Sequence, residues 1–269
     1  MKVRDRSERL IIYGILLVTL SSCGMKDKLT FFPDRTSAIP EKDIPSYATE
    51  HWIETSDGET IQSFLFLHDK NKKSPLIIYF HGNAGNLYHR FDNAVRLFDM
   101  DHDVLLVSYR GYSKSTGKPN EKGIYIDGTS AVNYATQSLG YKEDEISIFG
   151  RSLGSAVAIH ISQHRNFKNL ILITPLTSGK EMASAMGLGF LKFIAGNSYN
   201  SLEKINNIHS RVLIIHGDRD EVVPYHMGER LFQAYNGYKQ MVTIEGGMHN
   251  DLAEVDPMIF WGEIERFIQ

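Results

Sequence analysis

Apolar runs of strand length alternate along the chain with segments of helical periodicity, and this alternation constrains the fold more than any other feature. Residues 75–80 and 104–108 are almost continuously apolar, as expected of strands that are buried on both faces. Between them, apolar side chains recur at helical spacing from Leu87 to Phe98. The same pattern predicts helix 124–139, strand 146–149, helix 153–164, strand 170–173, strand 212–215, helix 224–236, strand 241–244 and helix 251–268.

Two β-branched and aromatic runs precede this alternation. Residues 51–55 and 60–67 flank Ser56-Asp57-Gly58-Glu59, which is typical of the turn of a β-hairpin. A hairpin followed by strand–helix units predicts one α/β domain, over residues 49–269, with a mostly parallel central sheet and helices on both faces. Such sheets bind ligands at the carboxyl ends of their strands, so functional residues are expected there.

Composition excludes several classes of protein and site. The 269 residues include one cysteine, Cys23, which rules out an internal disulfide framework and a cysteine-rich metal site. The formal net charge of −3 gives no global basic field, so nucleic acid is not expected as a partner. The histidines and carboxylates show no metal-ligand spacing, so neither a metal nor another cofactor is expected.

The N-terminus has the pattern of a targeting segment. Four basic residues within the first nine positions precede an apolar run from Leu10 to Leu20. A helix of that length covers about 16 Å, which is shorter than the roughly 30 Å hydrocarbon core of a bilayer. Residues 1–22 are therefore interpreted as a secretory signal peptide, with an uncleaved anchor helix as the alternative.

This segment ends in Leu20-Ser21-Ser22-Cys23, which resembles a bacterial lipobox. The resemblance implies cleavage before Cys23 and lipid attachment to that cysteine, through which the protein would be held at a membrane of the cell envelope. A spare thiol after an ordinary signal cleavage is the alternative. Gly24, in place of an aspartate, implies by the same resemblance the outer membrane, facing the periplasm.

Residues 23–48 are interpreted as a lipid-anchored tether. The segment contains three prolines with polar spacing and shows no periodicity that favours a helix or a strand. Phe31-Phe32-Pro33 is the part of the segment that could dock back onto the domain.

A candidate nucleophile follows the strand at 146–149. Gly150-Arg151-Ser152-Leu153-Gly154 is a G-x-S-x-G pattern between a strand and a helix of small residues, which is the context that this motif requires. The glycines would avoid collisions at a sharp turn that exposes the Ser152 hydroxyl. The Leu153 N–H would lie at the helix N-terminus, where it could bind an oxyanion. A glycine-rich turn with a capping serine is the alternative.

A serine hydroxyl needs a general base to take its proton. Where the serine stands in a G-x-S-x-G turn between a strand and a helix, the acid and then the histidine follow it along the chain. His249, in a glycine-rich loop after the last strand, is the predicted base, whereas His226 is expected on a helix surface. The predicted acid is Asp220, in the loop after the preceding strand, where it would fix the histidine tautomer. Asp218 is the alternative acid, and Glu221 is expected to be solvated.

A second oxyanion donor is expected in the loop after the strand at 75–80. This loop reads His81-Gly82-Asn83-Ala84-Gly85-Asn86, and its glycines permit a close approach of backbone, so the Asn83 N–H is the predicted donor. His81 is expected to bond the backbone at the strand end, with a catalytic role as the alternative.

With these residues in place, the chain resembles an α/β hydrolase, and more narrowly the Bem46-like serine hydrolases, which include the animal α/β-hydrolase domain 13 and 17 proteins. The resemblance runs from about residue 50 to the C-terminus. It implies a nucleophile, acid and base at Ser152, Asp220 and His249, and a structural role for Tyr109-Arg110-Gly111. Five motifs carry it, in this order: His81-Gly-Asn-Ala-Gly-Asn86; Ser108-Tyr-Arg-Gly-Tyr-Ser-Lys-Ser115 with Gly117-Lys-Pro119; Gly150-Arg-Ser-Leu-Gly154; His216-Gly-Asp-Arg-Asp-Glu-Val-Val-Pro224; and Gly246-Gly-Met-His-Asn250.

The resemblance implies hydrolysis of carboxyl esters or thioesters, without a cofactor, and some members of the family remove palmitoyl groups from proteins. Residues 175–208 occupy the place of a short lid in this fold. Their apolar side chains would suit an acyl or aryl group, or would simply cover the core. A peptidase or amidase on the same three residues, and a non-catalytic lipid-anchored binding protein, are the alternatives.

Overall fold

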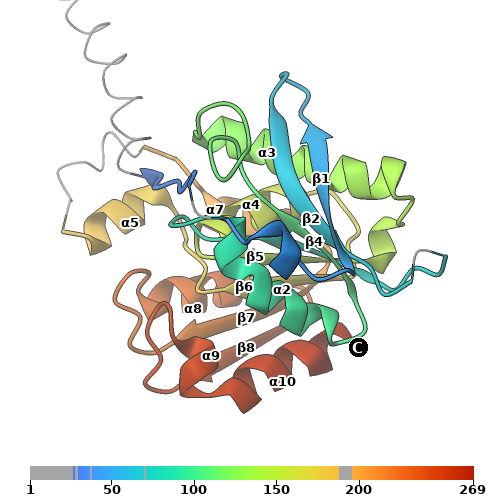
Figure 1. Cartoon of the computed structure of the whole chain (residues 1–269). Helices are drawn as coiled ribbons and strands as arrows, with labels where there is room; N and C mark the ends of the chain where they lie inside the picture. Colours follow the sequence, from blue (N-terminus) through green and yellow to red (C-terminus); the bar gives the residue numbers. More distant parts are fainter. Residues whose placement is uncertain (1–26, 28–29, 37, 70, 188–195) are drawn as a thin grey trace, which may run out of the picture.

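Eight strands form one sheet in the order β1-β2-β4-β3-β5-β6-β7-β8, with helices on both faces (Figure 1). The computed structural model describes residue 27 and residues 30–36, 38–69, 71–187 and 196–269. Strands β1 and β2 pair antiparallel, as do β2 and β4, and the other neighbouring strands pair parallel. The strands are β1 (Ala48–Glu54), β2 (Thr60–Phe66), β3 (Leu76–Phe80), β4 (Asp103–Val107), β5 (Ile146–Arg151), β6 (Asn169–Ile173), β7 (Arg211–Gly217) and β8 (Lys239–Ile244).

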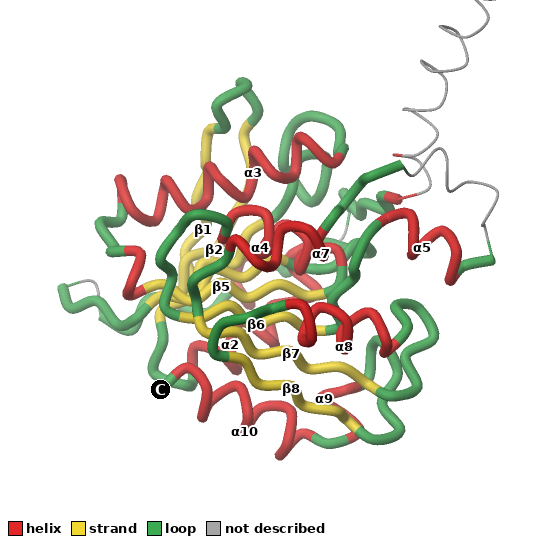
Figure 2. The backbone as a smooth tube through the Cα atoms, turned by 180° about the vertical axis from the view of Figure 1, so that it is seen from behind, coloured by secondary structure: helices red, strands yellow, loops and turns green. Residues whose placement is uncertain are grey.

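The helices divide between the two faces of this sheet, as the view from behind also shows (Figure 2). The buried apolar side chains of the sheet form two clusters with the helices. One cluster includes side chains of α3 (Glu121–Asn133), α4 (Leu153–Ser162) and α8 (Tyr225–Ala234), and the other includes side chains of α2 (Phe91–Phe98) and α10 (Pro257–Ile268). The short helices α5 (Gly179–Ala185), α7 (Ser201–Lys204) and α9 (Leu252–Val255) lie in the connections. The predicted α/β fold with a mostly parallel sheet is confirmed.

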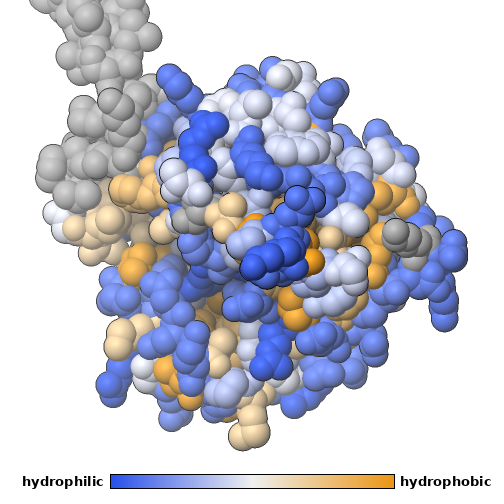
Figure 3. Space-filling view, in the orientation of Figure 1, coloured by the Kyte–Doolittle hydropathy of each residue, from blue (hydrophilic) through white to orange (hydrophobic). Residues whose placement is uncertain are grey.

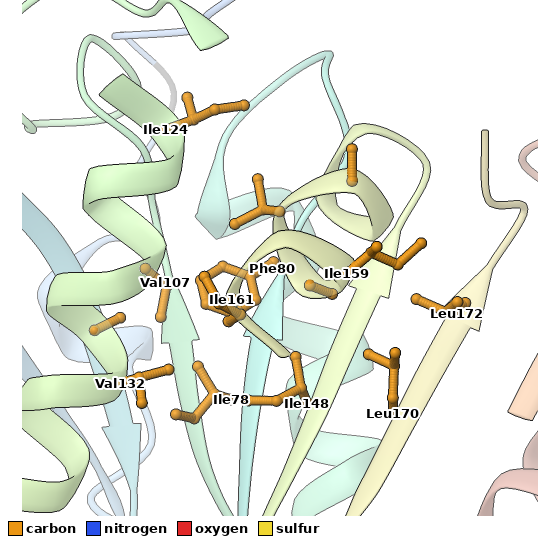
Figure 4. Packing of buried hydrophobic residues seen from close by; sticks show 14 of the residues in the cluster. Ile78, Phe80, Val107, Ile124, Val132, Ile148, Ile159, Ile161, Leu170 and Leu172 are labelled. Carbon is orange, nitrogen blue, oxygen red and sulfur yellow. The ribbon is translucent and has the colours of Figure 1, made fainter. Parts of the chain in front are cut away.

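Alternation of side chains along β3 explains why its sequence is apolar throughout. Leu76, Ile78 and Phe80 pack in the cluster beneath α3 and α4, where Figure 4 shows Ile78 and Phe80 among side chains of both helices. Ile77 and Tyr79 belong to the opposite cluster. Successive side chains of a strand point to opposite faces, so each residue of β3 faces one of the two apolar clusters and is apolar.

Three predicted helices differ from the observed ones. The C-terminal segment forms two helices, because Asp256 adopts φ −142° and ψ 84° and its side chain caps the N-terminus of α10 by accepting a hydrogen bond from Ile259 N–H. The helix predicted at 124–139 begins at Glu121 as α3 and continues after Asn133 as a five-residue π-turn. A 3₁₀ turn at Leu87–Arg90 precedes α2.

Part of the predicted tether packs on the domain. Phe31 is 5% exposed and belongs to the apolar cluster on the α3 and α4 side, Pro33 forms a β-bridge with Gly85, and Phe32 is exposed. The predicted signal peptide and Cys23 lie outside the described residues. None of the helices within the described ranges is long and apolar enough to cross a membrane.

Candidate active site

A strained turn places Ser152 between β5 and α4. Ser152 has φ 52° and ψ −118°, a left-handed conformation that costs free energy for a residue with a side chain. Its flanking glycines are required by close contacts. A methyl group on Gly154 would lie 2.1 Å from the Phe80 carbonyl oxygen, and one on Gly150 would lie 2.5 Å from the Gly154 carbonyl oxygen.

The structure brings Ser152, His249 and Asp220 together at the carboxyl ends of β5, β7 and β8. The His249 Nε2 atom lies 3.0 Å from Ser152 Oγ, and His249 Nδ1 lies 2.8 Å from Asp220 Oδ2. A carboxylate can only accept, so His249 Nδ1–H donates to Asp220 and Nε2 is left to accept the serine proton. Asp220 and His249 are buried, whereas Ser152 is partly exposed.

Three hydrogen bonds and one close contact hold the Asp220 carboxylate. Oδ1 accepts from Val222 N–H at 2.9 Å and from Val223 N–H at 2.8 Å, Oδ2 accepts from His249, and His216 Nε2 lies 3.2 Å from Oδ2. Burial alone would raise the pKa of Asp220, but the interactions with His216, His249 and Val223 outweigh burial and hold that pKa well below its usual range. Asp220 is therefore a fixed negative charge beside the imidazole.

The loop after β3 lies against the serine. A methyl group on Gly82 would be 3.5 Å from Ser152 Cβ, so Gly82, which precedes Asn83, borders the nucleophile. The Asn83 side-chain oxygen accepts from Phe32 N–H at 3.1 Å and from Tyr112 OH at 2.9 Å. Leu153 is the first residue of α4, so its N–H has no carbonyl of a preceding turn to bond.

His81 is fully buried and bonds the backbone, as expected. Its Nδ1 lies 2.7 Å from the Gly82 carbonyl oxygen, and burial lowers the pKa of His81 to about 3. The Tyr109 hydroxyl donates to the His81 carbonyl at 2.8 Å. Arg110 bonds the buried Asp127 carboxylate through its backbone N–H and its guanidinium. In the Tyr109-Arg110-Gly111 motif, Tyr109 therefore holds the start of the loop after β3, and Arg110 is fixed by Asp127.

Two residues weighed as alternatives are not in the cluster. His226 is an exposed residue of α8. The Asp218 carboxylate is exposed and accepts from Gly246 N–H at 2.7 Å, away from the imidazole. Glu221 is exposed, as expected, and its carboxylate also accepts a hydrogen bond from His249 N–H at 3.2 Å.

Sequence reasoning gave no role to two further residues at this site. His216 is the penultimate residue of β7, and its buried imidazole donates to the Val223 carbonyl at 2.8 Å and contacts Asp220. Arg151 donates to the carbonyl of His249 at 3.0 Å. His216 stands in a motif that carries the family resemblance, which was the available signal, whereas nothing local to Arg151 indicates a partner 98 residues away.

Among the residues that the structure describes, no group of three or more histidine, cysteine, aspartate or glutamate side chains is arranged to hold a metal ion. The chemistry available is that of a serine hydroxyl, an imidazole, a carboxylate and backbone N–H groups. A mostly parallel sheet of this order, with a serine on a strained strand-to-helix turn, defines an α/β hydrolase.

Comparisons with known proteins agree with this class. A model of the α/β-hydrolase fold matches residues 75–193. An uncharacterized protein of Mycobacterium tuberculosis is 30% identical over 260 residues, which cover 96% of this chain and 92% of that protein. Alpha/beta hydrolase domain-containing protein 17B of Xenopus tropicalis is 30% identical over 199 residues, covering 74% and 68%. Protein bem46 of Schizosaccharomyces pombe is 34% identical over 180 residues, covering 64% and 60%.

The chain therefore belongs to the α/β-hydrolase family and, within it, to the Bem46-like group, as its sequence motifs predicted. An esterase structure from Pyrococcus furiosus aligns with a TM-score of 0.74 at 18% identity, covering 89% of this chain and 97% of that one. At this level of identity the alignment establishes a shared fold.

Proposed function

We propose that this protein is a serine hydrolase that cleaves carboxyl-ester or thioester bonds through an acyl-enzyme intermediate. The observation that carries the proposal is the continuous hydrogen-bonded series from Ser152 Oγ through the His249 imidazole to Asp220, with distances of 3.0 and 2.8 Å. A nucleophile bonded to a base, which is in turn oriented by a third group, is the arrangement that activates a serine.

In the proposed reaction, Ser152 Oγ attacks the acyl carbon while its proton passes to His249 Nε2. The tetrahedral oxyanion is bound by the backbone N–H groups of Leu153 and Asn83. One such donor is typically worth about 3–4 kcal/mol of the barrier. The imidazolium then donates its proton to the leaving oxygen or sulfur as the C–O or C–S bond breaks, so that an alcohol or thiol is released. Water, deprotonated by His249, attacks the acyl-enzyme and releases the acid, which restores the serine.

Exposed apolar side chains around the three residues support an acyl substrate. Phe32, whose N–H bonds the Asn83 side chain, is 57% exposed, Met248 beside His249 is 48% exposed, and Val222 is 37% exposed. Figure 3 shows separate apolar areas within a mostly hydrophilic face of the molecule. An acyl chain that extends from the serine toward Phe32, Val222 or Met248 would meet apolar surface.

The test is a fluorophosphonate probe together with p-nitrophenyl butyrate turnover by the purified protein. We expect wild type to be labelled and active, and Ser152→Ala to lose both. His249→Ala should lose turnover, whereas His226→Ala, a change of an exposed histidine on α8, should not. Likewise Asp220→Asn should lower kcat by several orders of magnitude, and Asp218→Asn should not. An unlabelled wild type would contradict the proposal.

We further propose that the protein is lipid-anchored through Cys23 in a bacterial cell envelope, at the outer membrane facing the periplasm. The lipobox-like Leu20-Ser21-Ser22-Cys23 supports this, and two acyl chains suffice for stable anchoring. In cells fed labelled fatty acid, wild type should incorporate the label and Cys23→Ala should not. Unchanged labelling and membrane fractionation of Cys23→Ala would contradict the anchor.

A further inference from the structure

The loop that carries His249 is held by its own hydrogen bonds and by its surroundings. Gly246 has φ +76°, Gly247 N–H donates to the Ile244 carbonyl at 3.1 Å, and Met248 N–H donates to Asp251 Oδ1 at 2.7 Å. Two further hydrogen bonds tie the loop to the segment that follows β7. Gly246 N–H donates to the Asp218 carboxylate at 2.7 Å, and the Gly247 carbonyl accepts from Arg219 N–H at 3.0 Å. These ties stop short of the histidine itself.

At His249, both backbone groups are bound by charged side chains. The N–H donates to Glu221 Oε2 at 3.2 Å, and the carbonyl accepts from Arg151 Nη2 at 3.0 Å. The same Nη2 reaches the Asn250 side-chain oxygen at 2.9 Å. Glu221 follows the proposed acid Asp220 in the chain, and Arg151 precedes the proposed nucleophile. Each of the two other elements of the site therefore contributes one side chain to the histidine backbone.

The charges of the two side chains suit the groups that they bind. A carboxylate accepts from an N–H and a guanidinium donates to a carbonyl, and hydrogen bonds with one ionised partner are about twice as strong as neutral ones. Within the described residues, neither Arg151 nor Glu221 forms an ion pair. Their charged groups are thus available to the histidine loop rather than neutralised elsewhere.

We infer that Arg151 and Glu221 are positioning residues, which hold the His249 backbone so that its imidazole lies between Ser152 and Asp220. The inference rests on the proposed serine-hydrolase function and extends it to how the base is kept in place. Positioning matters steeply, because a displacement of about 1 Å can cost a factor of about 100 in rate. Loss of either tie should lower kcat, because the imidazole moves, and should leave KM within about twofold, because neither side chain is expected to bind substrate.

The experiment measures kcat and KM for p-nitrophenyl butyrate, and the melting temperature, of full-length variants. Arg151→Met removes the donor and should lower kcat by about 10- to 100-fold, whereas Arg151→Lys, which retains a donor, should recover part of it. Glu221→Met should lower kcat by less, since Glu221 is exposed, and Glu221→Gln, which retains the accepting oxygen, should be close to wild type. The controls are Arg219→Met, at an exposed residue of the loop that contains Glu221, and Glu245→Met, at an exposed residue of the loop that contains His249.

The Arg151→Met/Glu221→Met double variant should lose less than the product of the two single losses, because both side chains hold the same residue. A purely structural role for the two residues would lower the melting temperature and leave kcat unchanged in folded protein, and that result would overturn the inference. If Arg151→Met fails to fold, the comparison of Glu221→Met with Glu221→Gln still decides. Ser152→Ala separates the two proposals. If Ser152→Ala is inactive while Arg151→Met and Glu221→Met keep the wild-type kcat, the serine-hydrolase function stands and only the positioning role is refuted.

Discussion

Acid should destabilise this protein measurably through His81. The imidazole is fully buried at the end of β3, and burial lowers its pKa from 6.5 to about 3. Below pH 6.5 the unfolded chain therefore binds a proton at this position that the folded chain does not bind until about pH 3. The stability contributed by the neutral imidazole is complete above pH 6.5 and is lost as the pH falls.

These two pKa values set the magnitude. Between pH 8 and pH 5, His81 alone should lower the free energy of unfolding by about 2 kcal/mol. Burial also lowers the pKa values of His51, His102 and His160, which adds to the loss, and raises the pKa of Asp127 to about 6, which opposes it. These four groups remain in a variant at position 81, so their contributions cancel in a comparison with wild type.

Urea unfolding at pH 8 and pH 5 measures the effect. His81→Asn removes the titrating ring and retains an N–H that can reach the Gly82 carbonyl, and its loss of stability between the two pH values should be about 2 kcal/mol smaller than that of wild type. His226→Asn, at an exposed histidine, should behave as wild type. An equal loss in His81→Asn and wild type would refute the assignment of acid sensitivity to His81.

Two further predictions concern the free energy of unfolding, measured with urea. Gly154→Ala places a methyl group 2.1 Å from the last carbonyl of β3 and should lower that free energy by about 3 kcal/mol or more. Gly262→Ala in α10, where a methyl group meets nothing within 4 Å, should not lower it, and similar losses in the two variants would contradict the steric argument. Asp127→Ala leaves the buried Arg110 guanidinium without its fully buried partner and should lower the free energy of unfolding by about 3–5 kcal/mol. Asp57→Ala, at a carboxylate that is 38% exposed, should lower it by no more than about 1 kcal/mol, and the reverse order would contradict the argument from burial.

Strand positions were predictable because burial on both faces leaves a direct record in the sequence. The five residues of β3 and the five of β4 are all buried, and apolar runs as short as 76–80 and 104–107, bounded by turn residues, favour a buried strand over a helix by their length. The break before α10 was not predicted, because the residues on either side of Asp256 keep helical periodicity and the break depends on one backbone conformation. Docking of the segment around Phe31 was foreseen as a possibility, and Phe31 is buried, but the surface that buries it is built from distant segments and leaves no local signal.

The candidate site also combines residues that have a local sequence signal with residues that have none. The serine turn was predictable because its glycines, strand and helix are contiguous. The choice between Asp218 and Asp220 could be argued only from the position of Pro224, since both carboxylates stand in one loop. In three dimensions Asp218 is bound to Gly246 N–H and Asp220 to the imidazole. Contacts across 28 residues or more, such as Glu221 with His249, leave no local signal.

The strand order explains why the histidine loop needs so much support. His249 follows β8 and Ser152 follows β5, and β6 and β7 lie between them. Three strand spacings amount to about 14 Å, yet the imidazole lies 3.0 Å from the serine oxygen. The loop must therefore cross the end of β7, and it does so in close contact, because a methyl group on Gly217 would lie 2.1 Å from the Gly247 carbonyl oxygen. The loop reaches the nucleophile because both ends of this path hold it: Asp218, Arg219 and Glu221 follow β7, and Arg151 is the last residue of β5.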